Sequence, residues 1–297
     1  MLLKKKILVT GASGFVGKRY LVYSKDLFDI KTLSVTDYEP VVQDVAGADA
    51  VVHLAGLAHQ MVKVDPELYF IANFQKTKQL ADAAKAAGVP HFIFISTIKV
   101  FGETPMGILT ENSPCLPVND PYGESKLQAE QYLNSIADDN FTVSILRPPL
   151  IYGPGVKGNL DKMLKLCDSG YPLPFGSLNN RRTMVYVDNF IALINHLIAN
   201  RSAGLCLAGD DRPITTEELA SKMRKYMGLP GRLFTIPGFC RRLITWLRPA
   251  LGIRLFGALE MDCTASYKRI GFTPPHQIDE GIRVMVEAYQ KHKTDNQ

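Results

Sequence analysis

The sequence predicts an α/β protein in which a parallel sheet carries helices on both faces and a smaller, mostly helical lobe follows at the C-terminus. Short apolar runs typical of buried strands alternate with segments of helical spacing through the first half of the chain. After Arg147 this alternation gives way to stretches rich in Gly and Pro, beyond which most segments have helical spacing. The alternation predicts the sheet, and the later change of pattern predicts the lobe.

Local patterns place the individual elements. Strands are expected at 7–10, 30–35, 50–54, 92–96, 143–146 and 184–187. Helices are expected at 15–25, 66–87, 121–136 and 189–199. Pro66 suits the first turn of the second helix, and Gly88 and Pro90 suit its end. We assign residues 1–152 and 183–208 to the sheet domain, and residues 153–182 and 209–297 to the smaller lobe.

Composition narrows the class of protein. The 297 residues are 46% hydrophobic, which is enough to bury an enzyme-sized core. The net charge of +5 is too mild to indicate a nucleic-acid partner. Five scattered cysteines without a CxxC pair argue against disulfides and zinc, and no other cluster has metal-ligand spacing. The first apolar run is too short for a signal peptide or a membrane span, so a cytoplasmic location is expected.

A glycine-rich loop follows the first strand directly. Residues 10–17 read TGASGFVG and lead into the first helix. Glycines allow a tight turn and close backbone approach, while the helix presents free N–H groups and a positive dipole end to a diphosphate. This predicts a dinucleotide site of the Rossmann type. The expected cofactor contacts here are Gly11, Ser13, Gly14, Phe15, Val16 and Gly17.

The choice between NAD and NADP stays open. An acid that binds the adenine ribose is expected roughly twenty residues after the glycines, at the end of the second strand. Leu33, Ser34 and Val35 occupy that place, the nearest acid is Asp37, and no arginine replaces it. The span from the second strand to Ala50 is also short, which indicates that one strand–turn unit is trimmed.

Tyr122 and Lys126 form a YxxxK pair at the start of a predicted helix, so both side chains share one helical face. A nearby ammonium and a positive nicotinamide ring favour the phenolate and lower the pKa of the tyrosine, which is ordinarily about 10. Thr97 follows the strand at 92–96 and is placed to bond both Tyr122 and a substrate oxygen. These residues are the expected catalytic group. The alternatives are a solvated Tyr–Lys pair and a Thr97 that only caps a loop or helix.

Taken in order, several motifs resemble the extended short-chain dehydrogenase/reductase family over nearly the whole chain. The motifs are TGASGFVG (10–17), DAVVHLAG (49–56), ISTIKVFGE (95–103), PYGESK (121–126), RPPLIYGPG (147–155), RRTMVYVDN (181–189) and GFTPP (271–275). The segments HLAGLAHQM, STIKVFGE and GPGVKGN resemble the nucleotide-sugar epimerases and 4-ketoreductases of surface-polysaccharide synthesis, in the branch that handles UDP-N-acetylated sugars.

The resemblance implies further roles and a homodimer. The cofactor would also contact Tyr122 and Lys126, and the additional residues lining it would be Leu54, Ala55, Gly56, Pro149 and Leu150. The substrate diphosphate would be bound by Asn159, Arg182 and Arg254, because an arginine fork matches phosphate oxygens. A surface salt bridge is the alternative role for Arg182.

The expected reaction is NAD(P)-dependent redox chemistry at C4 of a UDP-sugar, either as a 4-epimerase or as a 4-ketoreductase. A dehydratase is disfavoured, because Ile98 and Lys99 stand where such enzymes carry an acid pair beside Thr97. A non-catalytic NAD(P) sensor is disfavoured by the retained Tyr122–Lys126 pair. A reductase of apolar substrates would give Arg182 no partner.

Two further features have alternative interpretations. His53 and His59 flank the turn at 54–56, and packing residues are expected there rather than catalytic or metal-binding ones. Residues 239–248 form an amphipathic helix with apolar residues on one face and arginines on the other. It is either a lid of the smaller lobe or a surface that docks on a membrane. The neighbouring basic residues are Arg232, Arg241, Arg242, Arg248 and Arg254.

Overall fold

The computed structural model describes residues 4–58, 64–103, 107–247 and 257–295. Of the residues discussed above, Arg254, Arg248 and His59 lie outside these ranges.

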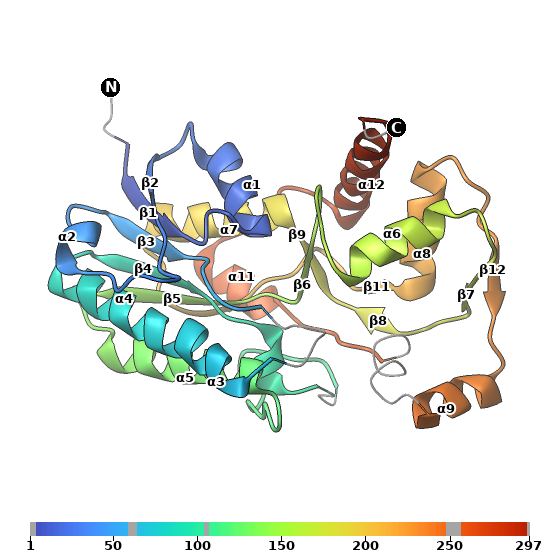
Figure 1. Cartoon of the computed structure of the whole chain (residues 1–297), viewed down its shortest axis with the longest axis horizontal. Coiled ribbons are helices and arrows are strands. Elements are labelled where there is room, and N and C mark those ends of the chain that lie inside the picture. Colours follow the sequence, from blue (N-terminus) through green and yellow to red (C-terminus); the bar gives the residue numbers. More distant parts are fainter. Residues whose placement is uncertain (1–3, 59–63, 104–106, 248–256, 296–297) are drawn as a thin grey trace.

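The centre of the molecule is a six-stranded parallel sheet with the strand order β10-β5-β4-β3-β1-β2 (Figure 1). Its strands are β1 (Lys6–Thr10), β2 (Asp29–Leu33), β3 (Ala50–His53), β4 (His91–Ile95), β5 (Thr142–Arg147) and β10 (Gly204–Leu207). The expected α/β class is confirmed. The strand expected at 184–187 is β9 (Met184–Tyr186), and it pairs outside this sheet with β6 (Leu150–Tyr152).

The shortened segment after the second strand has a clear structural counterpart. The chain runs from β2 through the single-turn helix α2 (Val42–Val45) directly to β3, on the other side of β1. No strand of the described chain pairs with the outer edge of β2. The strand order reverses across β1, and in such sheets ligands bind beyond the carboxyl ends of the strands at this reversal.

Alternating side chains of the strands feed two cores. Ile7 and Val9 pack into the core beneath α1 (Phe15–Ser24) and α7 (Val187–Asn200). Leu8 and Val51 pack into the opposite core, beneath α4 (Lys76–Ala86) and α5 (Pro121–Ile136). Figure 1 shows the two helix layers on opposite faces of the sheet. This arrangement is the expected consequence of the two-residue period of a strand.

The long helix expected at 66–87 contains a structural irregularity. It begins as α3 (Pro66–Tyr69), where the side chain of Asp65 accepts a hydrogen bond from the backbone N–H of Glu67, and it continues as α4. Between them, Phe70–Gln75 forms a π-helical turn, η1. Such a turn inserts an extra residue and is frequent at functional sites. The periodicity predicted the helix but not the turn.

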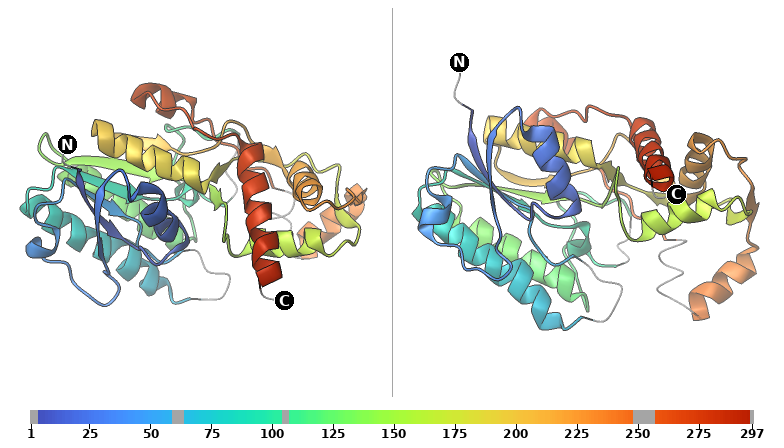
Figure 2. Two further views of the ribbon diagram at one scale, coloured as in Figure 1. Left: turned by 90° about the horizontal axis from the view of Figure 1, so that it is seen from above. Right: turned by 45° about the horizontal axis from the view of Figure 1, so that its top comes forward.

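The remaining elements form a smaller lobe beside the sheet (Figures 1 and 2). Its helices are α6 (Asn159–Asp168), α8 (Thr216–Tyr226), α9 (Gly238–Leu247) and α12 (Ile278–Asp295). Its short strands pair as β7 (Leu173–Gly176) with β12 (Leu233–Thr235), and β8 (Arg181–Arg182) with β11 (Ile214–Thr215). One helix of the C-terminal segment, α11 (Thr264–Ile270), instead packs against β10 of the main sheet.

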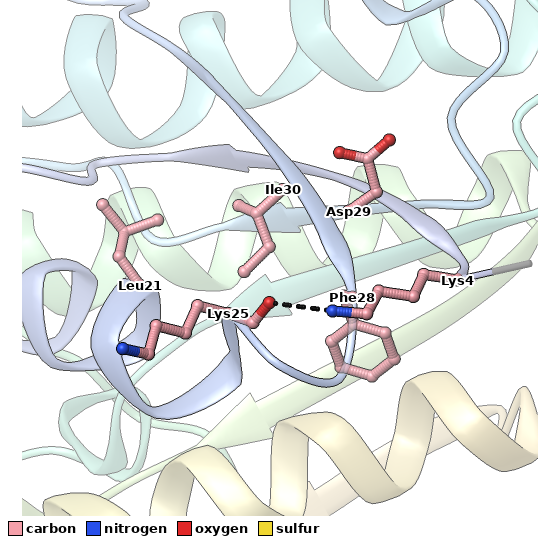
Figure 3. A pocket seen from close by; sticks show the side chains of 6 residues that line it. All are labelled: Lys4, Leu21, Lys25, Phe28, Asp29 and Ile30. Carbon is pink, nitrogen blue, oxygen red and sulfur yellow. Dashed lines mark hydrogen bonds between the residues drawn. The ribbon is translucent and has the colours of Figure 1, made fainter.

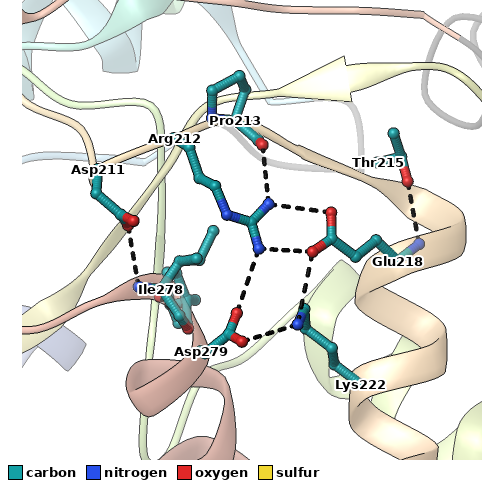
Figure 4. A network of polar contacts seen from close by, with 9 residues as sticks. Asp211, Arg212, Pro213, Thr215, Glu218, Lys222, Ile278 and Asp279 are labelled. Atoms are coloured by element: carbon teal, nitrogen blue, oxygen red, sulfur yellow. Dashed lines mark hydrogen bonds and ion pairs between the residues drawn. The ribbon is translucent and has the colours of Figure 1, made fainter.

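An ion-pair network joins two helices of the lobe (Figure 4). Arg212 binds Glu218 of α8 at 2.6 Å and Asp279 of α12 at 3.3 Å. Lys222 of α8 lies 2.9 Å from Asp279 and completes the link. Because several charges share these partners, the network fixes α8 against α12 better than an isolated surface pair would.

Candidate active site

The glycine loop and the turn after β3 pack backbone against backbone. Gly11 has a φ of +72°, and a Cβ atom there would lie 2.5 Å from the backbone nitrogen of Ala55. A Cβ on Gly17 would lie 2.2 Å from the carbonyl oxygen of Gly11. Only glycine fits at both positions. Because neither residue has a side chain, the predicted cofactor loop 11–17 can lie directly against the predicted turn 54–56.

The start of α1 suits an anion. Gly14 precedes the helix, no side chain caps it, and its first turn holds no acid. Ser13 and Gly14 are exposed, and Phe15 and Val16 are half-buried, so a ligand can approach this end of the helix. Free N–H groups and the helix dipole favour a phosphate group here. The loop therefore fits the diphosphate of a dinucleotide.

A chain of hydrogen bonds ties β1, β3 and η1 together behind this loop. Thr10 Oγ1 donates to His53 Nδ1 at 2.7 Å, and His53 Nε2 donates to Thr77 Oγ1 at 2.9 Å. Thr77 in turn donates to the carbonyl of Asn73 at 2.7 Å, which fixes this direction of donation. Burial lowers the pKa of His53 to about 3, so its imidazole is neutral. His53 is a packing residue, as expected.

Asn73 is a residue of the site that the sequence did not single out. It lies in the π-helical turn and is fully buried. Its Oδ1 accepts from the backbone N–H of Leu57 at 2.8 Å, and its Nδ2 donates to the Leu57 carbonyl at 3.1 Å and to Ser125 Oγ at 3.2 Å. The amide thus holds the turn at 54–57 against α5. The signal in the sequence that could have indicated Asn73 is a polar residue at a position where the predicted helix is buried.

Lys126 reaches from α5 to the same turn. Its Nζ donates to the carbonyl of Ile95 at 2.8 Å and lies 4.6 Å from the ring centre of Phe94. A Cβ on Gly56 would lie 3.2 Å from this nitrogen. Burial lowers the pKa of Lys126 to about 8, and the charge of Glu130 acts in the opposite direction. The ammonium therefore lies between the end of β4 and the predicted cofactor turn.

The Tyr122 hydroxyl is hydrogen-bonded to the side chain of Thr97. Burial raises the pKa of Tyr122, the Thr97 hydrogen bond lowers it, and the charge of Asp120 raises it. Desolvation is the largest of these effects in the protein alone, and the lowering expected from Lys126 together with a nicotinamide ring stays a prediction. Thr97 also accepts from the backbone N–H of Lys99 at 3.2 Å, so it caps a short helix as well as contacting Tyr122.

A buried ion pair supports these residues from below. Arg147 Nε donates to Glu130 Oε1 at 3.0 Å, and both side chains are almost completely buried. Ser96 also donates to Glu130, and the guanidinium of Arg147 lies 4.8 Å from the ring centre of Phe101. These bonds join the ends of β4 and β5 to α5. Removing one partner would leave a buried charge unpaired, which is strongly destabilising. Neither residue of this pair is among those that the sequence motifs predict for the site.

The predicted substrate residues lie on other elements. Pro149 is buried, and Leu150 is exposed at the start of β6. Asn159 is exposed as the first residue of α6. Arg182 lies half-buried in β8, where its Nε donates to the carbonyl of Gly257 at 3.0 Å. Their roles stay predictions, as does that of Arg254, which the structure does not describe.

Two hollows lie away from this arrangement. One, of about 480 Å³, is lined by residues at the amino ends of β1 and β2 and by α1 (Figure 3). There Lys4 Nζ donates to the carbonyl of Lys25 at 3.3 Å. The other, of about 640 Å³, lies between α6 and α12. Neither hollow includes the carboxyl ends of β1, β3 and β4, where the predicted catalytic and cofactor residues gather.

We expect Gly11→Ala to abolish NADH binding, because its Cβ would displace the turn at Ala55. Gly47→Ala is the matched control: its φ of +74° imposes the same backbone strain, about 1 kcal/mol, but no atom lies within 4 Å of the added Cβ. NADH fluorescence titration measures binding, and denaturant unfolding measures stability. Equal loss of NADH affinity in both variants would contradict the packing argument.

Known proteins share this architecture. Residues 7–206 match the family described as the NAD dependent epimerase/dehydratase family. A UDP-glucose 4-epimerase of Vibrio cholerae is 34% identical, over 96% of this chain and 95% of its own length. A second relative, 29% identical over 93% of this chain and 92% of its own length, is an N-acetyl-alpha-D-glucosaminyl-diphospho-ditrans,octacis-undecaprenol 4-epimerase of Escherichia coli O157:H7.

Solved structures agree with the fold. UDP-glucuronic acid 4-epimerase from Bacillus cereus, in complex with NAD, superposes with a TM-score of 0.78 at 18% identity, covering 97% of this chain and 99% of that one. UDP-N-acetylglucosamine 4-epimerase from Methanobrevibacter ruminantium M1, in complex with UDP-N-acetylmuramic acid, gives 0.78 at 20% identity, covering 98% and 100%. From its matched residues and its relatives, the chain belongs to the NAD-dependent epimerase/dehydratase family, within the extended short-chain dehydrogenases/reductases.

Proposed function

We propose that this protein is an NAD-dependent 4-epimerase of a UDP-sugar. The observation that carries the proposal is the Tyr122 hydroxyl, hydrogen-bonded to Thr97 while the Lys126 ammonium of the same helix reaches the glycine turn at Gly56. A phenol, a hydroxyl and an ammonium beside a dinucleotide loop form the group that carbinol oxidation requires. NAD, when bound, supplies the acceptor and later the donor of hydride at C4.

Each side chain has a defined task in this reaction. Tyr122 removes the proton from the sugar 4-hydroxyl as C4 is oxidised, and returns it when C4 is reduced on the opposite face. Thr97 orients the sugar oxygen and the phenol. Lys126 binds the cofactor and stabilises the phenolate through its charge. Because burial disfavours the phenolate of Tyr122, the positive charges of Lys126 and of the oxidised cofactor supply the counteracting effect.

Epimerisation is favoured over the other reactions of the family. The two relatives described above are both 4-epimerases, and one of them is 34% identical. The acid pair that a dehydratase would carry beside Thr97 is missing, because Ile98 and Lys99 occupy those positions. Ile98 is buried, and Lys99 forms an ion pair with Glu103. The retained Tyr122–Lys126 pair argues against a sensor. A 4-ketoreductase uses the same residues and remains the alternative for the assay to exclude.

We assign nucleotide-sugar binding to the smaller lobe, residues 153–182 and 209–297. Arg182, Asn159 and Arg254 would bind the diphosphate, with the sugar extending toward Tyr122. The half-buried guanidinium of Arg182, whose pKa is lowered by burial, suits a phosphate partner in a partly dehydrated setting. An N-acetylated hexosamine is the proposed sugar, in line with the family branch that the sequence motifs resemble.

A lipid-linked sugar diphosphate is a second candidate substrate. The relative from Escherichia coli O157:H7 is named for such a substrate, and it covers 93% of this chain. One structural observation favours this candidate: Phe239, Trp246 and Leu247 of α9 in the smaller lobe are exposed. The two candidates share the sugar and the diphosphate and differ in what the diphosphate is attached to.

We further propose that the enzyme works in the cytoplasm as a homodimer. All five cysteines are free thiols, as is usual in reducing compartments. The homodimer is an expectation from the family resemblance, which light scattering can measure.

The proposed activity is tested by incubating the protein with UDP-N-acetylglucosamine and UDP-glucose, with and without added NAD. Proton NMR reports the configuration at C4, and NADH absorbance reports net redox change. We expect formation of the C4 epimer without net consumption of NADH. Stoichiometric NADH consumption with the 4-keto sugar would identify a 4-ketoreductase instead.

Tyr122→Phe should lower turnover by about 10²–10⁴-fold, because it removes the acid/base group and leaves the helix intact. NADH affinity should stay close to that of the wild type. Tyr132→Phe is the matched control, since this tyrosine lies on the same helix but bonds Asp82 instead. Turnover of Tyr122→Phe at the level of this control would remove Tyr122 from the mechanism.

Arg182→Ala should weaken nucleotide-sugar binding roughly 10- to 100-fold, which is the effect of losing a charge-assisted hydrogen bond to phosphate. NADH affinity should change little. Arg181→Ala provides the control, because this neighbouring arginine pairs with Glu260 at 3.1 Å. Calorimetric titration with UDP and with NADH measures both constants, and equal losses for the two ligands would contradict the assigned role.

A further inference from the structure

One helix of the smaller lobe has an apolar face that is exposed among the described residues. Helix α9 has four apolar side chains at the spacing of one helical face: Phe239, Leu243, Trp246 and Leu247. Phe239 is 73% exposed, Trp246 is 77% exposed and Leu247 is 60% exposed. Phe234, in the strand leading to the helix, is also exposed. Large aromatic side chains gathered this way indicate a contact surface.

The other helices of the lobe bury their apolar faces. In α8, for example, Leu219 and Met223 are buried in the main core. Figure 1 shows α9 at the far end of the lobe from the sheet, and Figure 2 shows the same separation from a second direction. A lid helix packed on the lobe would cover its apolar side chains. The exposure of Phe239 and Trp246 therefore argues against the lid interpretation.

The segment that carries α9 is strongly basic. Between Lys225 and Glu260 the sequence contains five arginines and no acidic residue. Arg232 and Arg242 are exposed among the described residues of this segment. The rest of the chain is nearly neutral, since the whole protein has a net charge of only +5. The excess of basic charge therefore lies in the part of the sequence that carries α9, and it complements an anionic surface.

The size of α9 determines how it can meet a lipid bilayer. Ten residues span about 15 Å, which is half of the hydrocarbon thickness of a bilayer. Within the described residues, no helix has the length and apolar character needed to cross a membrane. An amphipathic helix with tryptophan and phenylalanine on one side and arginines on the other instead lies in the interface, parallel to the membrane plane.

We propose that α9 docks the protein on the surface of an anionic phospholipid bilayer. Phe239, Trp246 and Leu247 insert at the level of the headgroups, and Arg232 and Arg242 bind lipid phosphates. The sheet domain stays in water. The inference does not depend on the proposed reaction, because it uses no residue of the candidate active site.

The chain supplies its own probe, because Trp246 is its single tryptophan. We expect its fluorescence to shift to shorter wavelength when vesicles of phosphatidylcholine and phosphatidylglycerol are added to the full-length protein. Lipids brominated along the acyl chain should quench it. Vesicles of phosphatidylcholine alone should bind at least about tenfold more weakly, and added salt should reverse binding to the anionic vesicles.

Variants separate the apolar from the electrostatic contribution. Phe239→Ser and Leu247→Ser should each weaken vesicle co-sedimentation about tenfold. Arg242→Glu should weaken it by a similar factor. The controls are Leu27→Ser and Arg283→Glu, which alter exposed residues on α12 or beyond the end of α1. NADH affinity should be the same in all five variants, which confirms that they fold.

Three outcomes would overturn the proposal. The first is an unchanged Trp246 spectrum with anionic vesicles. The second is a blue shift that follows protein concentration without lipid, which would assign the face to a second copy of the chain. The third is equal vesicle binding by Phe239→Ser and Leu27→Ser. Loss of the 4-epimerase activity in the NMR assay would affect none of these measurements, so the two proposals can fail separately.

Discussion

The close approach of two backbone turns governs the rest of this structure. Gly11 lies so near Ala55 that no side chain can stand between them. Behind this contact, the chain of hydrogen bonds from Thr10 through His53 to Thr77 fixes the ends of β1 and β3 relative to η1. A dinucleotide diphosphate requires rigid backbone N–H groups at a helix start, and these contacts hold that helix start in place.

Burial sets the electrostatics of the neighbouring side chains. Desolvation moves the pKa of Lys126 down to about 8 and that of Tyr122 up, so both groups are shifted toward their neutral forms in the protein alone. Glu130 and Arg147 form an ion pair in this dry environment, where each provides the counter-charge of the other. The site thus places a buried proton-transfer group, Tyr122, beside a rigid ion pair. In this dry environment a bound cation lowers the pKa of the phenol more than it would in water.

Much of the fold could be predicted from periodicity and turn chemistry. The sheet strands, the helix starts at Phe15 and Pro121, and the trimmed unit after β2 all follow from local sequence. The π-helical turn with Asn73 and the Glu130–Arg147 pair could not be predicted, because they depend on contacts between distant segments. The desolvation that raises the Tyr122 pKa in the protein alone could not be predicted either, because burial also depends on contacts between distant segments.

The trimmed unit also affects how the sheet ends. Among the described residues β2 is the last strand on its side, so its outer edge has no strand partner there and is available to a strand of another molecule. The strand has only five residues, and it carries Asp29 and Lys31. Charged side chains on a short edge strand disfavour pairing with a second chain, so this edge of the sheet resists β-aggregation.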